Sequence, residues 1–151
     1  MCSAKPIMAR AAKVSTRILI VDDLPEMRKL IRTYIEEETD FCVCGEAIDG
    51  LDAIDKAQNL KPDLIILDAS MPRMNGIDAA PKLKKLLPET PIILFTFHEG
   101  MMRGFDAREV GVDAVVTKAN GMVPLKESVQ ALLQRRHLLI RHNDDGAKPK
   151  H

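Results

Sequence analysis

The chain has few of the features that mark membrane, secreted or nucleic-acid-binding proteins. No apolar run approaches the roughly 20 residues of a membrane-spanning helix, and the N-terminal segment lacks the apolar core of a secretory signal. Three cysteines are too few for the disulfide framework of a small secreted domain. With 22 acidic and 22 basic residues, the bulk charge indicates neither direct nucleic-acid binding nor a membrane surface as partner. We therefore expect a cytoplasmic globular protein.

The length and composition fit one domain with two polar ends. A chain of 151 residues buries about 70% of the surface that its unfolded form exposes, which is enough to fold without disulfides or a structural metal. The first and last segments are polar, charged and aperiodic. We expect a mobile N-terminal tail over 1–15, an ordered domain over 16–138, and a mobile C-terminal tail or the start of a linker over 139–151.

Between these ends, short apolar runs alternate with segments of helical spacing. Strands are expected at 17–22, 41–47, 63–68, 91–96 and 113–117, and helices at 24–38, 51–60, 77–87, 101–110 and 125–137. This alternation predicts an α/β fold, a doubly wound five-stranded parallel sheet in the order 2-1-3-4-5. Pro81 falls within the third helical pattern, so we expect that helix to begin near Ile77 or Asp78.

Polar side chains follow four of the expected strands at the edge where such sheets bind ligands. Asp22 and Asp23 end the first strand, Asp68 the third and Thr96 the fourth, and Lys118 follows the fifth. Three converging carboxylates repel one another, so the sequence predicts a hard divalent cation, Mg²⁺, with room for a phosphoryl group. A lysine and a threonine are suited to hold the other phosphoryl oxygens.

Asp68 is the best candidate nucleophile, because it ends a central strand between the acid pair and the lysine. Carboxylates accept phosphoryl groups to form aspartyl phosphates. Each of these residues alone has a plain structural explanation, such as a helix cap or a solvated side chain. The hypothesis depends on four such signals at successive strand ends.

The chain from Thr16 to His137 resembles the receiver domain of two-component response regulators. The resemblance is carried by four segments: ILIVDD at 18–23, DLIILDASMPRMNG at 63–76, PIILFT at 91–96 and AVVTK at 114–118. The stretch CVCGEAIDGLDAI is similar to receivers of the NarL type, which precede a helix-turn-helix output domain. The resemblance implies a flavodoxin-like, CheY-like fold and a phospho-acceptor switch rather than an enzyme that acts on other molecules.

The resemblance also implies a role for each residue of the motif. Asp68 would take the phosphoryl group, Asp23 and Asp68 would ligate Mg²⁺ directly, and Asp22 would assist through water. The backbone carbonyl of Ser70 would complete the metal ligands, Thr96 would be the switch hydroxyl, and Lys118 would pair with the phosphoryl group. The expected donor is a sensor histidine kinase or a histidine phosphotransfer protein. The recipient of the signal would be a downstream protein or an output domain, and homodimer formation stays open.

Three positions depart from the family pattern: Phe97 follows the switch threonine, Val115 stands where an aromatic residue is usual, and Ala119 stands where many receivers have proline. Ser70 and His98 occupy positions that tune dephosphorylation in the family. The first two departures leave an alternative open, a degenerate receiver that binds proteins without phosphorylation. A flavodoxin-type FMN binder and a haloacid-dehalogenase-type phosphatase fit less well, because both need a different first loop.

Overall fold

The structure is a computed structural model that describes residues 15–98, 100 and 106–146, without the side chains of 142–146. Five parallel strands form one sheet in the order β2-β1-β3-β4-β5, as the sequence predicts. The strands are β1 (Arg17–Val21), β2 (Cys42–Ala47), β3 (Leu64–Leu67), β4 (Ile92–Thr96) and β5 (Ala114–Thr117). The helices of the described residues are α1 (Pro25–Glu38), α2 (Gly50–Leu60), α3 (Gly76–Leu86) and α4 (Val123–Gly146). Together they confirm the doubly wound α/β architecture.

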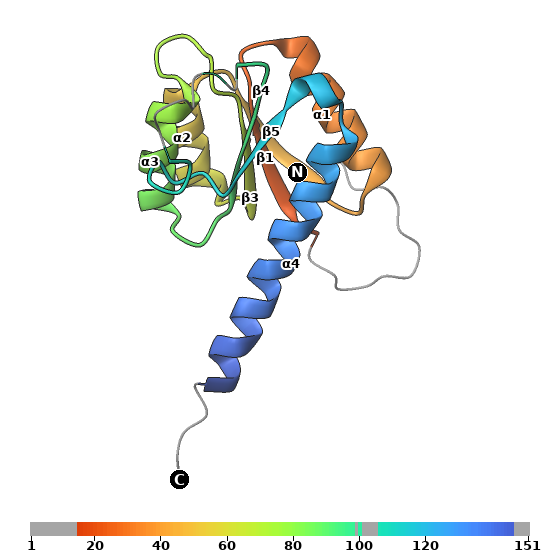
Figure 1. Ribbon diagram of the computed structural model, residues 1–151, viewed down its shortest axis with the longest axis vertical. Coiled ribbons are helices and arrows are strands. Elements are labelled where there is room, and N and C mark those ends of the chain that lie inside the picture. The colour runs from red at the N-terminus through yellow and green to blue at the C-terminus, as the bar shows by residue number, and fades with distance from the viewer. Residues whose placement is uncertain (1–14, 99, 101–105, 147–151) are drawn as a thin grey trace.

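Helices cover both faces of the sheet, α2 and α3 on one side and α1 and α4 on the other (Figure 1). Successive residues of β1 alternate between these layers. Leu19 and Val21 pack with α2 and α3, whereas Ile18 and Ile20 pack with α1 and α4. The central strands β3 and β4 are buried along their whole length, as expected for strands covered on both faces. Each fully buried leucine or isoleucine contributes about 1.5–3 kcal/mol. None of the described helices is long and apolar enough to cross a membrane.

Local signals explain where the helices begin. Pro25 occupies the first turn of α1, where its missing N–H costs nothing. Asn75 caps α3 by accepting a hydrogen bond from the Asp78 N–H at 2.8 Å. Because α3 begins at Gly76, Pro81 is its sixth residue and lies beyond the first turn. The helix begins one residue before the expected start at Ile77, and the missing N–H of Pro81 leaves one internal hydrogen bond of α3 unmade.

Two further segments differ from the sequence-based expectation. Residues 101–105 of the helix expected at 101–110 lie outside the described residues, and residues 107–111 form turns that begin at the Asp106 carbonyl. The last helix continues to Gly146, so residues 139–146, which the sequence placed in a tail, are helical. This extension projects away from the sheet (Figure 1) and exposes 64% of Leu139.

Candidate functional site

Three aspartates meet at the C-terminal edge of the sheet. Strands β1 and β3 pair in parallel with Val21 opposite Leu67, so the residues that follow them emerge side by side. The Asp68 N–H donates to the Val21 carbonyl at 2.9 Å, which holds the two strand ends together. Carboxylate oxygens of Asp22, Asp23 and Asp68 all lie within 4.8 Å of one another. The convergence predicted from the sequence is therefore present.

Lys118 joins this cluster from the C-terminal end of the edge strand β5. It begins a short 3-10 turn (Lys118–Asn120) directly after β5, and it is buried. Its Nζ lies 2.5 Å from Asp22 Oδ2 and 3.4 Å from Asp68 Oδ2. Within the described part of the chain, no second cation forms an ion pair with Asp22, Asp23 or Asp68. One ammonium thus faces three carboxylates, and a divalent cation would balance the remaining negative charge.

The environment of Asp68 opposes its ionisation. This side chain is only 6% exposed. Burial raises its pKa, the Lys118 ammonium lowers it, and the Asp22 carboxylate raises it again. Hydrogen bonds from the Thr96 hydroxyl and the Ser70 N–H also lower the pKa, but the net shift is upward. Additional positive charge in this cluster would favour the carboxylate form that a nucleophile needs.

Thr96 flanks Asp68 from the end of a strand, and Ser70 flanks it from the loop between β3 and α3. Thr96 is the last residue of β4 and is fully buried, and its hydroxyl accepts a hydrogen bond from the His98 N–H at 2.9 Å. Ser70 is two residues beyond Asp68 in the chain, and its backbone nitrogen lies 3.4 Å from Asp68 Oδ1. Both residues therefore lie where the sequence placed them, beside the candidate acceptor.

A glycine allows the chain to turn back against Asp68. The Gly76 N–H donates to the Ala69 carbonyl at 2.9 Å. A Cβ atom at Gly76 would lie 2.0 Å from the Asp68 carbonyl oxygen, a contact that no side chain tolerates. Any larger residue would push the loop between β3 and α3 away from the acidic cluster.

Phe97, one of the unusual positions, lies on the outer side of Lys118. Its ring centroid is 5.7 Å from Lys118 Nζ, and the buried Phe95 ring is 5.9 Å away on another side. Phe97 is 59% exposed, so its ring does not fold into the core. The lysine is thus held by two aromatic rings as well as by two carboxylates. Val115, the other apolar departure, is also exposed.

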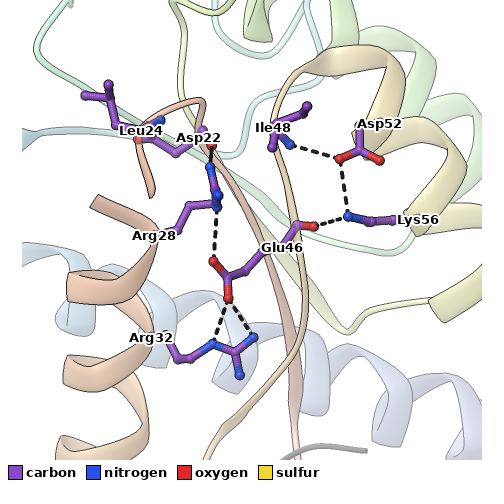
Figure 2. A network of polar contacts seen from close by, with 8 residues as sticks. All are labelled: Asp22, Leu24, Arg28, Arg32, Glu46, Ile48, Asp52 and Lys56. Atoms are coloured by element: carbon purple, nitrogen blue, oxygen red, sulfur yellow. Dashed lines mark hydrogen bonds and ion pairs between the residues drawn. The ribbon is translucent and has the colours of Figure 1, made fainter. Parts of the chain in front are cut away.

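Sequence reasoning missed a polar network that supports the loop of the acid pair. The Arg28 side chain donates to the Asp22 carbonyl at 2.8 Å and to Glu46 Oε1 at 3.0 Å (Figure 2). Glu46 also binds Arg32, and its own carbonyl accepts from Lys56 (Figure 2). From the sequence, the edge strand β2 was expected to contribute no polar side chain to this end of the sheet. The one available signal was a charged residue, Glu46, in an otherwise uncharged strand.

The structural neighbours include several solved receiver domains. A LuxR-family response regulator from Aurantimonas superposes with a TM-score of 0.75 at 30% identity, covering 82% of this chain and 88% of that one. The Thermotoga maritima response regulator TrrA, solved in complex with Mg²⁺ and BeF, superposes with a TM-score of 0.71 at 32% identity. That match covers 78% of this chain and 98% of TrrA.

Sequence comparison leads to the same family. The chain is 37% identical over 122 residues to a protein-glutamate methylesterase/protein-glutamine glutaminase of Pyrococcus horikoshii, covering 80% of this chain and 32% of the relative. It is 34% identical over 114 residues to the response regulator VraR of Staphylococcus saprophyticus, covering 76% of this chain and 54% of VraR. The chain thus spans about a third to a half of these curated relatives. The model of the family described as response regulator receiver domain matches residues 18–130, and the chain belongs to this family.

Proposed function

We propose that this chain is a Mg²⁺-dependent phospho-acceptor switch in which Asp68 takes the phosphoryl group. The observation that carries the proposal is the position of Asp68, whose carboxylate lies within reach of two further carboxylates and 3.4 Å from the Lys118 ammonium. One neighbour of similar fold, TrrA, was solved with Mg²⁺ and BeF. The expected donor is a phosphohistidine on a sensor histidine kinase or a histidine phosphotransfer protein.

The residues of the cluster fit a magnesium ion. Asp22, Asp23 and Asp68 supply hard carboxylate oxygens, and the Ser70 carbonyl is the fourth candidate ligand. Mg²⁺ prefers such oxygens and usually keeps several waters, which leaves room for phosphoryl oxygens. When bound, it would neutralise the carboxylates and the developing charge on the transferred group.

The proposed step needs only Asp68 as nucleophile. A carboxylate oxygen of Asp68 attacks the phosphorus, so that a P–O bond forms while the P–N bond to the donor histidine breaks. The electron pair of the broken bond leaves with the imidazole, which takes up a proton. Lys118 and Thr96 then bind oxygens of the new phosphoryl group through an ammonium and a hydroxyl.

Phosphorylation would change which proteins this domain contacts. We propose that the signal passes to a downstream protein or an output domain through the surface formed by the end of β4 and the edge strand β5, where Phe97 and Val115 are exposed. The match to methylesterases covers about a third of their length, so we extend no esterase activity to this chain. We propose a cytoplasmic protein that catalyses only its own phosphorylation and dephosphorylation.

Intact mass measurement tests this proposal. The protein is incubated with a small acyl phosphate, with and without Mg²⁺, beside the Asp68→Asn variant. A gain of one phosphoryl group that requires both Mg²⁺ and Asp68 is the expected result. No gain with either a small donor or a phosphorylated histidine kinase, in protein that remains folded, would favour the degenerate receiver that binds partners without phosphorylation.

A further inference from the structure

A third buried aspartate, Asp49, lies outside the carboxylate cluster. Asp49 precedes α2 and is only 1% exposed. Its Oδ1 caps the helix by accepting from the Asp52 N–H at 2.9 Å. Its Oδ2 accepts from Arg73, with Nε at 2.6 Å and Nη2 also in contact. A buried carboxylate needs such partners, because an unpaired charge in the interior is strongly destabilising.

These partners keep Asp49 charged. Burial raises the pKa of Asp49, but the hydrogen bonds from the Asp52 N–H and from Arg73 outweigh this and hold the pKa below its usual range. Arg73 itself belongs to the loop between β3 and α3, five residues after Asp68. The ion pair therefore joins the start of α2 to the loop that leaves the candidate phospho-acceptor.

The backbone of this loop is held in an unusual conformation. Arg73 has a φ of +62°, in the left-handed region that side chains other than glycine rarely adopt. Such conformations are unfavourable for residues with a side chain and persist where surrounding contacts fix them. The next residue, Met74, accepts a hydrogen bond from the Gly50 N–H at 2.9 Å. A Cβ at Gly50 would lie 2.8 Å from that carbonyl oxygen, so glycine permits this close approach.

The other end of the same loop carries Ser70. The loop is closed at its base by the bond from the Gly76 N–H to the Ala69 carbonyl. Ser70 thus lies between two fixed points, the base at Ala69 and the attachment to α2 at Arg73 and Met74. Mg²⁺ demands nearly ideal octahedral geometry, so a displaced carbonyl ligand weakens its binding.

We infer that Asp49 and Arg73 are positioning residues for the magnesium site, which hold the β3–α3 loop so that the Ser70 carbonyl can ligate the ion together with Asp68. This inference rests on the proposed function, since it takes Ser70 as a metal ligand. Neither side chain of the pair belongs to the carboxylate cluster. The pair acts on the ion through the loop.

The test is a Mg²⁺ titration of the unphosphorylated protein, followed by the amide NMR signals of residues 68–76. Replacing groups that orient metal ligands typically weakens binding 10- to 100-fold, and we expect about tenfold for Arg73→Gln. Asp49→Asn keeps a helix cap but loses the charge, and it should weaken binding in the same direction. Arg73→Lys keeps the positive charge but lacks the planar guanidinium that can donate two hydrogen bonds to one carboxylate. This variant should therefore bind Mg²⁺ with an intermediate affinity.

A matched control removes an ion pair at the opposite end of the same strand. Arg136 donates to the Asp63 carbonyl at 2.7 Å and lies 3.5 Å from Asp63 Oδ1, just before β3 begins. Arg136→Gln should lower the melting temperature and leave the Mg²⁺ affinity at that of the wild type. A pair with a merely structural role would behave in the same way.

The outcomes separate the inference from the function on which it rests. Wild-type Mg²⁺ affinity in both Asp49→Asn and Arg73→Lys, whatever their melting temperatures, would overturn the inference and leave the proposed function standing. These two variants suffice if Arg73→Gln does not fold. No Mg²⁺-dependent signal change in the wild type would overturn both.

Discussion

Lys118 Nζ lies 2.5 Å from Asp22 Oδ2, and both side chains are buried. Breaking a buried ion pair by removing one partner typically costs about 3–5 kcal/mol, because the other charge stays uncompensated. We expect Lys118→Met to lower the free energy of unfolding by about 3 kcal/mol in Mg²⁺-free buffer. Mg²⁺ should recover part of this loss, since it supplies positive charge to the same carboxylates. Urea unfolding with EDTA and with Mg²⁺ measures both values, and an equal loss in the two buffers would contradict the expectation.

The raised pKa of Asp68 predicts that its charge destabilises the metal-free fold. Because the folded pKa lies above the unfolded one, stability is fully present below the unfolded pKa and is lost as the pH rises through the folded pKa. Asp68→Asn should therefore be more stable than the wild type at neutral pH without Mg²⁺. The difference amounts to about 1.4 kcal/mol for each pH unit between the two pKa values.

This advantage of Asp68→Asn should shrink as the pH falls from about 7 to about 4, because the wild-type carboxyl then becomes neutral. Chemical unfolding of both proteins at each pH gives the comparison. A difference that stays constant with pH would show that the variant acts by some route other than charge. Addition of Mg²⁺ at neutral pH should stabilise the wild type more than Asp68→Asn.

Phe97 is expected to restrain Lys118, the lysine proposed to pair with the phosphoryl group on Asp68. Its ring lies 5.7 Å from Lys118 Nζ, and a cation–π contact at an exposed position is worth about 0.5–1 kcal/mol. Removing the ring in Phe97→Ala should raise the rate of phosphorylation by a small acyl phosphate about two- to fivefold. Stopped reactions analysed by intact mass give the rates. Phe97→Leu, which keeps bulk without the ring electrons, separates the electrostatic contact from simple obstruction.

Gly76 is predicted to tolerate no side chain. In Gly76→Ala, the new Cβ would overlap the Asp68 carbonyl oxygen, and forced overpacking of this kind costs about 1–3 kcal/mol. The variant should melt at a lower temperature and bind Mg²⁺ more weakly, because the loop after Asp68 has to shift. Gly100→Ala is the matched control, since a Cβ there meets nothing within 4 Å. Equal melting temperatures for the two variants would refute the predicted clash.

The sheet and the position of the site were predictable because polar residues follow four of the five apolar runs. This pattern of polar residues, together with the geometry of parallel sheets, predicts the strand order. It also predicts that four side chains converge at one edge: Asp22, Asp23, Asp68 and Lys118. The helix layer was less predictable. In α2 the large apolar residue Leu51 is exposed, whereas the small residues Gly50, Ala53 and Ala57 are buried.

The supporting contacts could not be read from the sequence because they join distant positions. Arg73 and Asp49 are 24 residues apart, and Arg28 and Glu46 are 18 apart. Each of these residues alone resembles an ordinary surface charge or helix cap. The length of α4 was missed for a different reason. Leu138, Leu139 and Ile140 are exposed, and the sequence after them is mostly polar, so the apolar periodicity that marks a helix fades there.

The continuous helix of α4 has a mechanical consequence. Its residues from Leu138 to Gly146 extend about 13 Å at the usual rise per residue, and they do so without a break from the segment in which Leu125 and Val129 pack against the sheet. A rigid rod anchored at one end converts a small tilt at its base into a larger displacement at its tip. A movement of the sheet beneath the first turns of α4 would therefore cause a larger displacement at the C-terminal end of the helix.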